Sequence, residues 1–161
     1  MRTLKLILLG IFVLYFQLII APKFTLYRII PNFFIAYLIF INIKLELKFT
    51  LPISFFLGIA FDLTHPSLLG LNTFSFLIIS FLVSKYHRNI NKQNFAVVAL
   101  SVCTLNIIHY LIFVIYNLLA TEILPRFFLL TLFAIVYNTL FSILTIYIFS
   151  VIYKLKLSIH V

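Results

Sequence analysis

The stretch that organises this chain is Gly58-Ile59-Ala60-Phe61-Asp62-Leu63, followed by Thr64-His65-Pro66-Ser67-Leu68-Leu69-Gly70. Asp62 is one of only three acidic residues among 161. A carboxylate within an apolar membrane segment costs about 2.5–3.5 kcal/mol, so such a group is buried against protein, hydrated or functional. Gly58 and Gly70 bracket Asp62 and are two of the chain's three glycines. Their positions predict a close approach of the backbone to a neighbour or a sharp turn.

The composition around this stretch excludes a soluble domain. The chain is 65% hydrophobic and 9% charged, with a mean hydropathy of +1.24, whereas soluble domains are about 45–50% apolar and about 25% charged. We therefore predict an all-α, polytopic integral membrane protein that contacts the lipid bilayer directly.

Six apolar segments predict six helices within a single transmembrane domain that covers residues 1–161. Their expected bounds are about 4–21, 31–43, 49–63, 69–84, 95–120 and 127–153. Pro31 and Asn32 are expected to open the second helix, with the proline near the first turn, where its missing N–H does no harm. Several of these helices are short, because segment 49–63 rises only about 22 Å, whereas a hydrocarbon core is about 30 Å thick.

The distribution of basic residues predicts the orientation. If the N-terminus is cytoplasmic, nine Lys and Arg fall in inner segments and three in outer ones. The inner residues are Arg2, Lys5, Lys44, Lys48, Lys85, Arg88, Lys92, Lys154 and Lys156, and the outer ones are Lys23, Arg28 and Arg126. This positive-inside bias places both termini in the cytoplasm. It also accounts for the net charge of +9 through topology and anionic lipid, so we expect no nucleic-acid partner.

A polar cluster is expected near the outer face, where Asp62 and His65 meet the start of the fourth segment at Asn72. Thr64 and Thr73 would belong to the same cluster. Asp62 would either stabilise the turn by accepting backbone N–H bonds, with the amides of Thr64 and His65 in reach, or form a proton-carrying pair with His65. The imidazole of His65 alone is more typical of a turn residue than of a ligand.

The fifth segment carries Asn106, His109, Tyr110 and Asn117 on one helical face. One interpretation is hydrogen bonding between helices, worth about 0.6 kcal/mol per contact in membranes. The other is a polar seam that reaches toward Asp62 and lines a ligand cavity or a proton path. The sixth segment presents a similar face, with Asn138, Ser142 and Thr145.

Sequence motifs of catalysis are missing. The chain has no H-E-x-x-H motif, no phosphate-cradling glycine loop and no recognisable Ser/His/Asp order. A single cysteine excludes a disulfide or a cysteine-based metal framework. We therefore expect no enzyme activity, no cofactor and no metal site.

In their order and spacing, the motifs resemble those of the rod shape-determining protein MreD family. The resemblance rests on Pro31-Asn32, on Gly58-x-x-x-Asp62-Leu63, on Leu69-Gly70 and on Lys85-Tyr86. It implies a scaffold of the bacterial cell-elongation machinery in the cytoplasmic membrane. The implied partner is the bitopic protein MreC, which would connect the chain to MreB filaments and to the peptidoglycan synthases RodA and penicillin-binding protein 2. It also implies similarity to the fold of substrate-binding subunits of energy-coupling-factor transporters.

The resemblance leaves an alternative function open and suggests where a partner would bind. The alternative function is that of a substrate-binding membrane subunit of a small-molecule transporter built on the same fold. For the scaffold function, we expect a partner to dock on the short hairpin between the third and fourth segments, against Gly58, Gly70 and the polar turn between them.

Overall fold

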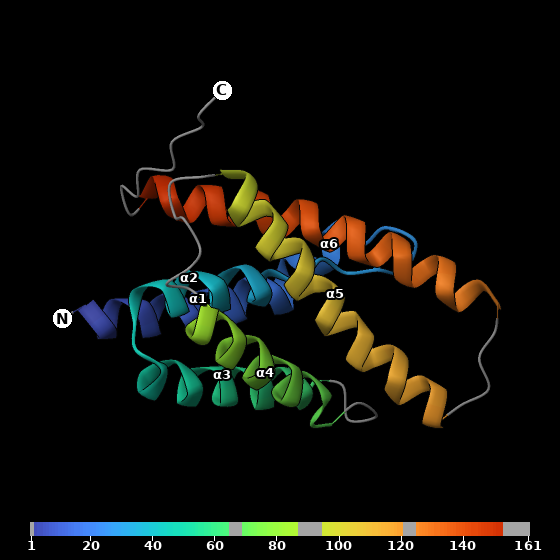
Figure 1. The fold of residues 1–161 in the computed structure, drawn as a ribbon, viewed down its shortest axis with the longest axis horizontal. Helices are drawn as coiled ribbons and strands as arrows, with labels where there is room; N and C mark the ends of the chain where they lie inside the picture. Colours follow the sequence, from blue (N-terminus) through green and yellow to red (C-terminus); the bar gives the residue numbers. More distant parts are fainter. Residues whose placement is uncertain (1, 65–68, 87–94, 121–124, 153–161) are drawn as a thin grey trace.

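The fold is seen in a computed structural model that describes residues 2–64, 69–86, 95–120 and 125–152 (Figure 1). This part of the chain forms six α-helices and one short 3-10 helix, which confirms the predicted all-α fold class. In chain order the elements are α1 (Arg2–Ile19), η1 (Ala21–Phe24), α2 (Phe33–Lys44), α3 (Leu47–Asp62), α4 (Leu71–Tyr86), α5 (Phe95–Ala120) and α6 (Pro125–Ile152).

All helices except α5 begin at residues other than those the sequence suggested, each shifted by two positions. Helix α2 begins at Phe33, after an Asn32 side chain that accepts a hydrogen bond from the Phe34 amide at 3.0 Å, so Asn32 is the N-cap and Pro31 precedes the helix. An asparagine at this position satisfies an N–H group that lacks an intrahelical partner. Helix α3 begins at Leu47, which puts Pro52 inside the helix instead of in its first turn.

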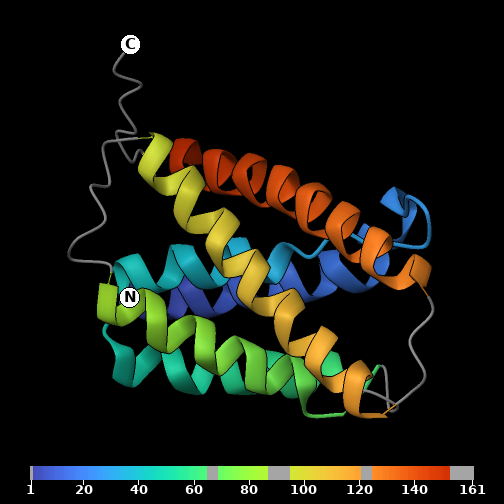
Figure 2. The same cartoon turned by 45° about the vertical axis from the view of Figure 1, so that its right-hand side comes forward.

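Helix α2 lies at the centre of the bundle and packs against α1, α3, α4, α5 and α6. Every residue from Phe33 to Asn42 is buried. A helix that is hydrophobic on all sides is stable only when other elements surround it. Helices α3 and α4 lie side by side below it, while α5 crosses obliquely from α6 to α4 (Figures 1 and 2).

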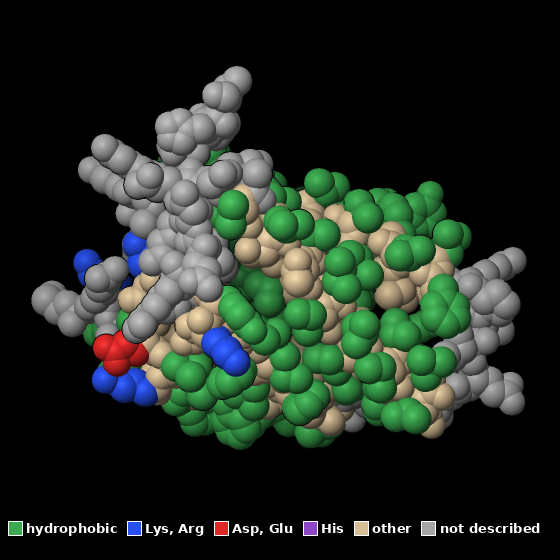
Figure 3. Space-filling view, in the orientation of Figure 1, with side chains coloured by type: hydrophobic (Ala, Val, Ile, Leu, Met, Phe, Trp, Pro, Cys, Tyr) green, Lys and Arg blue, Asp and Glu red, His purple; other side chains and the backbone are tan. Residues whose placement is uncertain are grey.

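The surface of the bundle is largely apolar, and polar side chains lie among the hydrophobic ones in its interior. Large hydrophobic side chains are exposed on α1, α3, α4, α5 and α6, with Phe56 at 69% and Leu100 at 70%. In Figure 3 hydrophobic side chains cover much of the described surface, and charged side chains gather toward the end where the N-terminus lies. An apolar surface of this kind is unlike that of a soluble domain and is expected where lipid replaces water around the helices.

The helices differ in their ability to cross a membrane. By length and composition two of them suffice, over Val97–Leu119 in α5 and Phe127–Ile152 in α6. The apolar stretches Leu4–Ile19, Phe33–Lys44 and Leu71–Tyr86 are shorter. Because α3 has 16 residues, it rises about 24 Å, less than a hydrocarbon core of about 30 Å.

Small polar residues join α2, α3 and α4 in the interior. The hydroxyl oxygens of Ser54 in α3 and Ser80 in α4 are 2.5 Å apart. The Asn42 side-chain amide of α2 donates a hydrogen bond to the Ser80 hydroxyl at 3.1 Å. All three residues are buried. Small hydroxyl-bearing residues allow close helix packing in membranes and satisfy each other across the interface.

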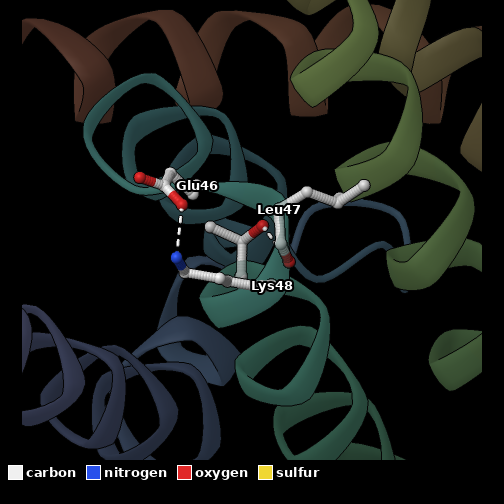
Figure 4. Close-up of polar contacts among 4 residues, drawn as sticks. Glu46, Leu47 and Lys48 are labelled. Carbon is white, nitrogen blue, oxygen red and sulfur yellow. Dashed lines mark hydrogen bonds and ion pairs between the residues drawn. The ribbon is translucent and has the colours of Figure 1, made fainter.

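An ion pair at the surface joins Glu46, the N-cap of α3, to Lys48 in its first turn. Lys48 Nζ lies 2.7 Å from Glu46 Oε2, and both side chains are well exposed (Figure 4). Exposed pairs of this kind contribute about 0–1 kcal/mol. The pair therefore marks a solvated end of the bundle and has little effect on its stability.

Candidate functional site

Asp62 ends α3 and fastens it to the beginning of α4. Its carboxylate is 1% exposed and accepts five hydrogen bonds. Oδ2 receives the Gly70 amide at 3.0 Å, the Thr73 amide at 3.0 Å and the Thr73 hydroxyl at 2.6 Å. Oδ1 receives the Asn72 amide at 3.1 Å and the Asn72 side-chain amide at 2.9 Å. A carboxylate at a helix N-terminus satisfies N–H groups that have no intrahelical partner and matches the helix dipole.

This geometry corrects the donors that we predicted for Asp62. The donors seen are Gly70, just before α4, and Asn72 and Thr73 in its first turn. The Thr64 amide is not among them, because it donates to the Phe61 carbonyl at 3.1 Å. Thr64 is exposed and lies outside the cluster. His65 falls outside the described residues, so its pairing with Asp62 stays a prediction.

The two glycines that bracket Asp62 have different roles. A Cβ atom at Gly58 would lie 2.4 Å from Thr73 Cα, so α3 and α4 touch through their backbones at this point. Gly70 has φ +93° and open space around it. It is needed for the left-handed turn that aims its amide at Asp62. Because Gly58 is buried between α3 and α4, it is not available to a partner helix, contrary to our expectation for the hairpin.

A second polar cluster lies where α2 begins. Asn32 donates its backbone amide to Asn138 Oδ1 of α6 at 2.5 Å, and its side-chain nitrogen lies 3.5 Å from His109 Nε2 of α5. His109 Nδ1 lies 2.6 Å from the hydroxyl of Ser75 in α4. The Asn138 side-chain amide also donates to the Tyr110 hydroxyl of α5. Four helices therefore meet through one connected set of hydrogen bonds.

Gln17 of α1 completes the anchoring of this helix start. Its side-chain nitrogen donates to the Pro31 carbonyl at 2.9 Å, and its oxygen accepts from the Phe33 amide at 2.8 Å. Gln17 is 3% exposed. The segment Pro31–Phe33 is thus held by α1 on one side and by Asn138 of α6 on the other.

The two clusters face one open cavity of about 320 Å³. Its walls are Gln17, Arg28, Ile29, Ile30, Asn32, Phe61, Asn72, His109, Tyr110, Phe113 and Ala134. Arg28 and Ile30 are exposed, whereas Asn32, Asn72 and His109 are buried. The cavity is therefore apolar along much of its wall, polar at its floor and open beside Arg28.

A strained turn carries Arg28 to this opening. Leu26 and Ile29 exchange two backbone hydrogen bonds at 3.0 and 2.8 Å, and the two residues between them have positive φ, 49° for Tyr27 and 68° for Arg28. Turns of this type normally take Asn-Gly or Gly-Gly. Each non-glycine residue in the left-handed region costs about 1–2 kcal/mol. The Tyr27 ring packs edge-on against Phe133, with ring centroids 5.4 Å apart, which helps to hold the turn.

The structure sorts the residues that the sequence singled out. It brings Asn32, Asn72 and His109 around one cavity, with Asp62 behind Asn72. Pro31 is not part of the cavity wall, and its carbonyl accepts the hydrogen bond from Gln17. Asn106 is buried but donates only to the Val102 carbonyl in its own helix, at 3.0 Å, so it does not join the His109 cluster. Of the described contacts of Asn117, the hydrogen bond from Nδ2 to the Phe113 carbonyl, at 2.7 Å, is also within α5.

Sequence reasoning missed Gln17, Arg28 and Ser75. Gln17 is a polar residue inside an otherwise apolar N-terminal segment, which is a signal that could have been used. Ser75 carries no such signal, since serine is common at helix contacts in membranes. Arg28 was counted only as a charge at the outer end of a helix.

The polar side chains of the two clusters bond to groups on neighbouring helices. Within residues 2–64, 69–86, 95–120 and 125–152, no three His, Cys, Asp or Glu side chains lie together as metal ligands would. Both oxygens of Asp62 are already occupied by donors. These hydrogen bonds join α3 to the beginning of α4.

The apolar surface, the buried polar contacts and the two long apolar helices define a polytopic helical membrane protein. The chain belongs to the MreD family, because the model of rod shape-determining protein MreD matches residues 1–156. This family comprises non-enzymatic membrane proteins that determine cell shape as part of the cell-elongation machinery.

A relative in Bacillus subtilis (strain 168), the rod shape-determining protein MreD, is 27% identical over 94 residues. That match covers 58% of this chain and 55% of the relative, so the chain spans about half of the relative's length. No solved structure matches the chain. The expected similarity to energy-coupling-factor transporter subunits therefore stays a prediction.

Proposed function

We propose that this chain is a non-enzymatic membrane scaffold of bacterial cell-wall elongation. The observation that carries the proposal is the family match over residues 1–156. The fold is compatible with it, since the carboxylate and polar side chains of the two clusters are used to join helices. The same match favours the scaffold over the transporter subunit that we considered as an alternative.

The proposed topology has six membrane crossings and cytoplasmic termini. The start of α1, the α2–α3 turn and the end of α4 lie at one end of the bundle, and η1 and the end of α3 lie at the other (Figure 1). The first end carries Lys44, Lys48 and Lys85, and the second carries Lys23 and Arg28. This segregation supports the positive-inside orientation. The short helices α2, α3 and α4 would cross where the bundle thins the bilayer.

The proposed direct partner is an MreC-like bitopic protein, through which the chain would reach MreB, RodA and penicillin-binding protein 2. Contacts within a bilayer depend on close packing and polar groups more than on apolar area. Since Gly58 is already used between α3 and α4, the partner is expected on lipid-facing helix sides or on the outer turns.

Reporter fusions at residues 90 and 123 and at the C-terminus test the topology. Cytoplasmic signals are expected at 90 and at the C-terminus, and an outer signal at 123. A cytoplasmic signal at 123 would contradict six crossings.

Co-purification tests the scaffold function directly. The chain would be expressed in a membrane with the MreC-like protein of the same genome and extracted in mild detergent. Retention of the partner is expected for the wild type and for Thr104→Ala, which changes one exposed residue whose hydroxyl bonds within α5. Failure of the wild type to retain the partner, with both proteins present and monodisperse, would contradict the proposal.

A further inference from the structure

The cavity beside Arg28 offers hydrogen-bond donors that the protein does not use. The Tyr110 hydroxyl accepts from Asn138, and within the described residues its own proton has no acceptor. Asn32 Nδ2 makes one long contact, 3.5 Å to His109, and its second N–H has no described acceptor. Arg28 adds a guanidinium, which carries five N–H groups and a permanent charge.

Acceptors are scarce around the same cavity. Among the described residues that line it, Asn72 Oδ1 has no donor, although Asn72 is only 4% exposed. Asp62, the one buried carboxylate in the described part of the chain, has both oxygens occupied by the first turn of α4. Helix α2 begins at the cavity, because its N-cap Asn32 is part of the cavity wall. A helix N-terminus carries about half a positive charge.

The cavity has the size and wall composition of a small-molecule site. Its volume of about 320 Å³ is at the lower end of the range of about 300–1,000 Å³ for ligand pockets. Ile29, Ile30, Phe61 and Phe113 supply an apolar wall. The strained turn at Tyr27–Arg28 holds the cation at the opening, and strain of this kind persists where the surroundings enforce it and often serves a site.

We propose that this cavity binds the anionic head of a phosphate ester that also carries a hydroxyl group. Arg28, Tyr110 and Asn32 would donate to the phosphate oxygens, and Asn72 Oδ1 would accept from the hydroxyl. Glycerol phosphate combines both features, and it exists as a free molecule and as the head of phosphatidylglycerol. This binding site goes beyond the scaffold function and does not depend on it.

The test uses the full chain, purified in neutral detergent, with glycerol 3-phosphate as the soluble probe and glycerol as the neutral control. Arg28→Gln removes the cation without changing the demand for a left-handed backbone. Lys23→Gln is the matched control, because Lys23 is an exposed cation at the same end and is not part of the cavity wall. Arg28→Lys restores the charge. Each variant is used only after its circular dichroism and elution volume match the wild type.

The soluble arm has a defined expectation. Arg28→Gln should raise the Kd for glycerol 3-phosphate about tenfold or more, since a hydrogen bond to a charged group contributes enough for that change. Tyr110→Phe should raise it about threefold to tenfold, Arg28→Lys should recover part of the loss, and Lys23→Gln should change it less than about twofold.

The lipid arm distinguishes the two sources. Native mass spectrometry of the chain released from nanodiscs compares phosphatidylglycerol with phosphatidylcholine. Retention of phosphatidylglycerol that is lost in Arg28→Gln supports a lipid head, and binding of the soluble probe without such retention supports a free phosphate ester. The proposal is overturned if neither probe binds, if glycerol binds as tightly as its phosphate, or if Arg28→Gln and Lys23→Gln behave alike.

Discussion

Replacing Gly58 by alanine tests how α3 and α4 pack. In an isolated helix this change stabilises the helix by about 1 kcal/mol, because glycine loses more backbone freedom than alanine when the helix forms. In this structure the added Cβ would lie 2.4 Å from Thr73 Cα and 3.0 Å from Thr73 N. Both atoms are backbone, so no side-chain rotation relieves the overlap and the helices must separate.

The cost follows from what the separation disturbs. Overpacking of a tight contact costs about 1–3 kcal/mol. Moving Thr73 also weakens its two hydrogen bonds to Asp62, at 3.0 and 2.6 Å, and loss of a bond to a charged group costs about 1.5–3 kcal/mol. After subtracting the helix-propensity gain, we expect Gly58→Ala to destabilise the chain by about 2–5 kcal/mol.

The assay is unfolding in mixed micelles with a rising fraction of denaturing detergent, followed by circular dichroism. Ala60→Gly is the opposite change two residues away in the same helix, and it should cost about 1 kcal/mol through helix propensity alone. An equal or higher midpoint for Gly58→Ala than for the wild type would refute the backbone contact between α3 and α4.

Three further changes should be measurable in the same assay. Asp62→Asn should lower the stability less than Asp62→Leu, because the amide keeps one acceptor for the α4 amides. Leucine leaves every donor unpaired, at about 1–3 kcal/mol each. Equal midpoints for the two variants would contradict the five hydrogen bonds to Asp62. Gly70→Ala should cost about 1–2 kcal/mol through its positive φ alone, and no loss would show that this turn is not left-handed. Asn138→Leu should cost about 1–3 kcal/mol, because the amide of Asn32 and the hydroxyl of Tyr110 lose their partner. The control Thr104→Ala should change the free energy of unfolding by less than about 0.5 kcal/mol. A loss for Asn138→Leu no larger than that of the control would contradict the link between α2 and α6.

The sequence by itself determined the class of the protein and the position of its helices to within a few residues. Long apolar segments separated by charged or proline-containing turns leave few alternatives to a bundle of membrane helices, since backbone in a bilayer must satisfy its hydrogen bonds internally. That Asp62 would have buried hydrogen-bond partners was also readable, because a lone carboxylate in such surroundings requires them. Asn32 was correctly placed at a helix start, as asparagine favours that position.

Only the tertiary structure decided which groups meet. The hydrogen-bond donors to Asp62 come from Gly70, Asn72 and Thr73. They lie across a turn whose geometry was not apparent from the sequence. Helices that face lipid and helices that face protein share the same apolar composition, so periodicity does not reveal that α2 is enclosed on all sides. Asn106 and His109 illustrate the limit, since both are buried on α5 and only His109 finds partners on α4 and at the start of α2. The crossing angle and axial offset of neighbouring helices decide such pairings, and they arise from packing along the whole interface.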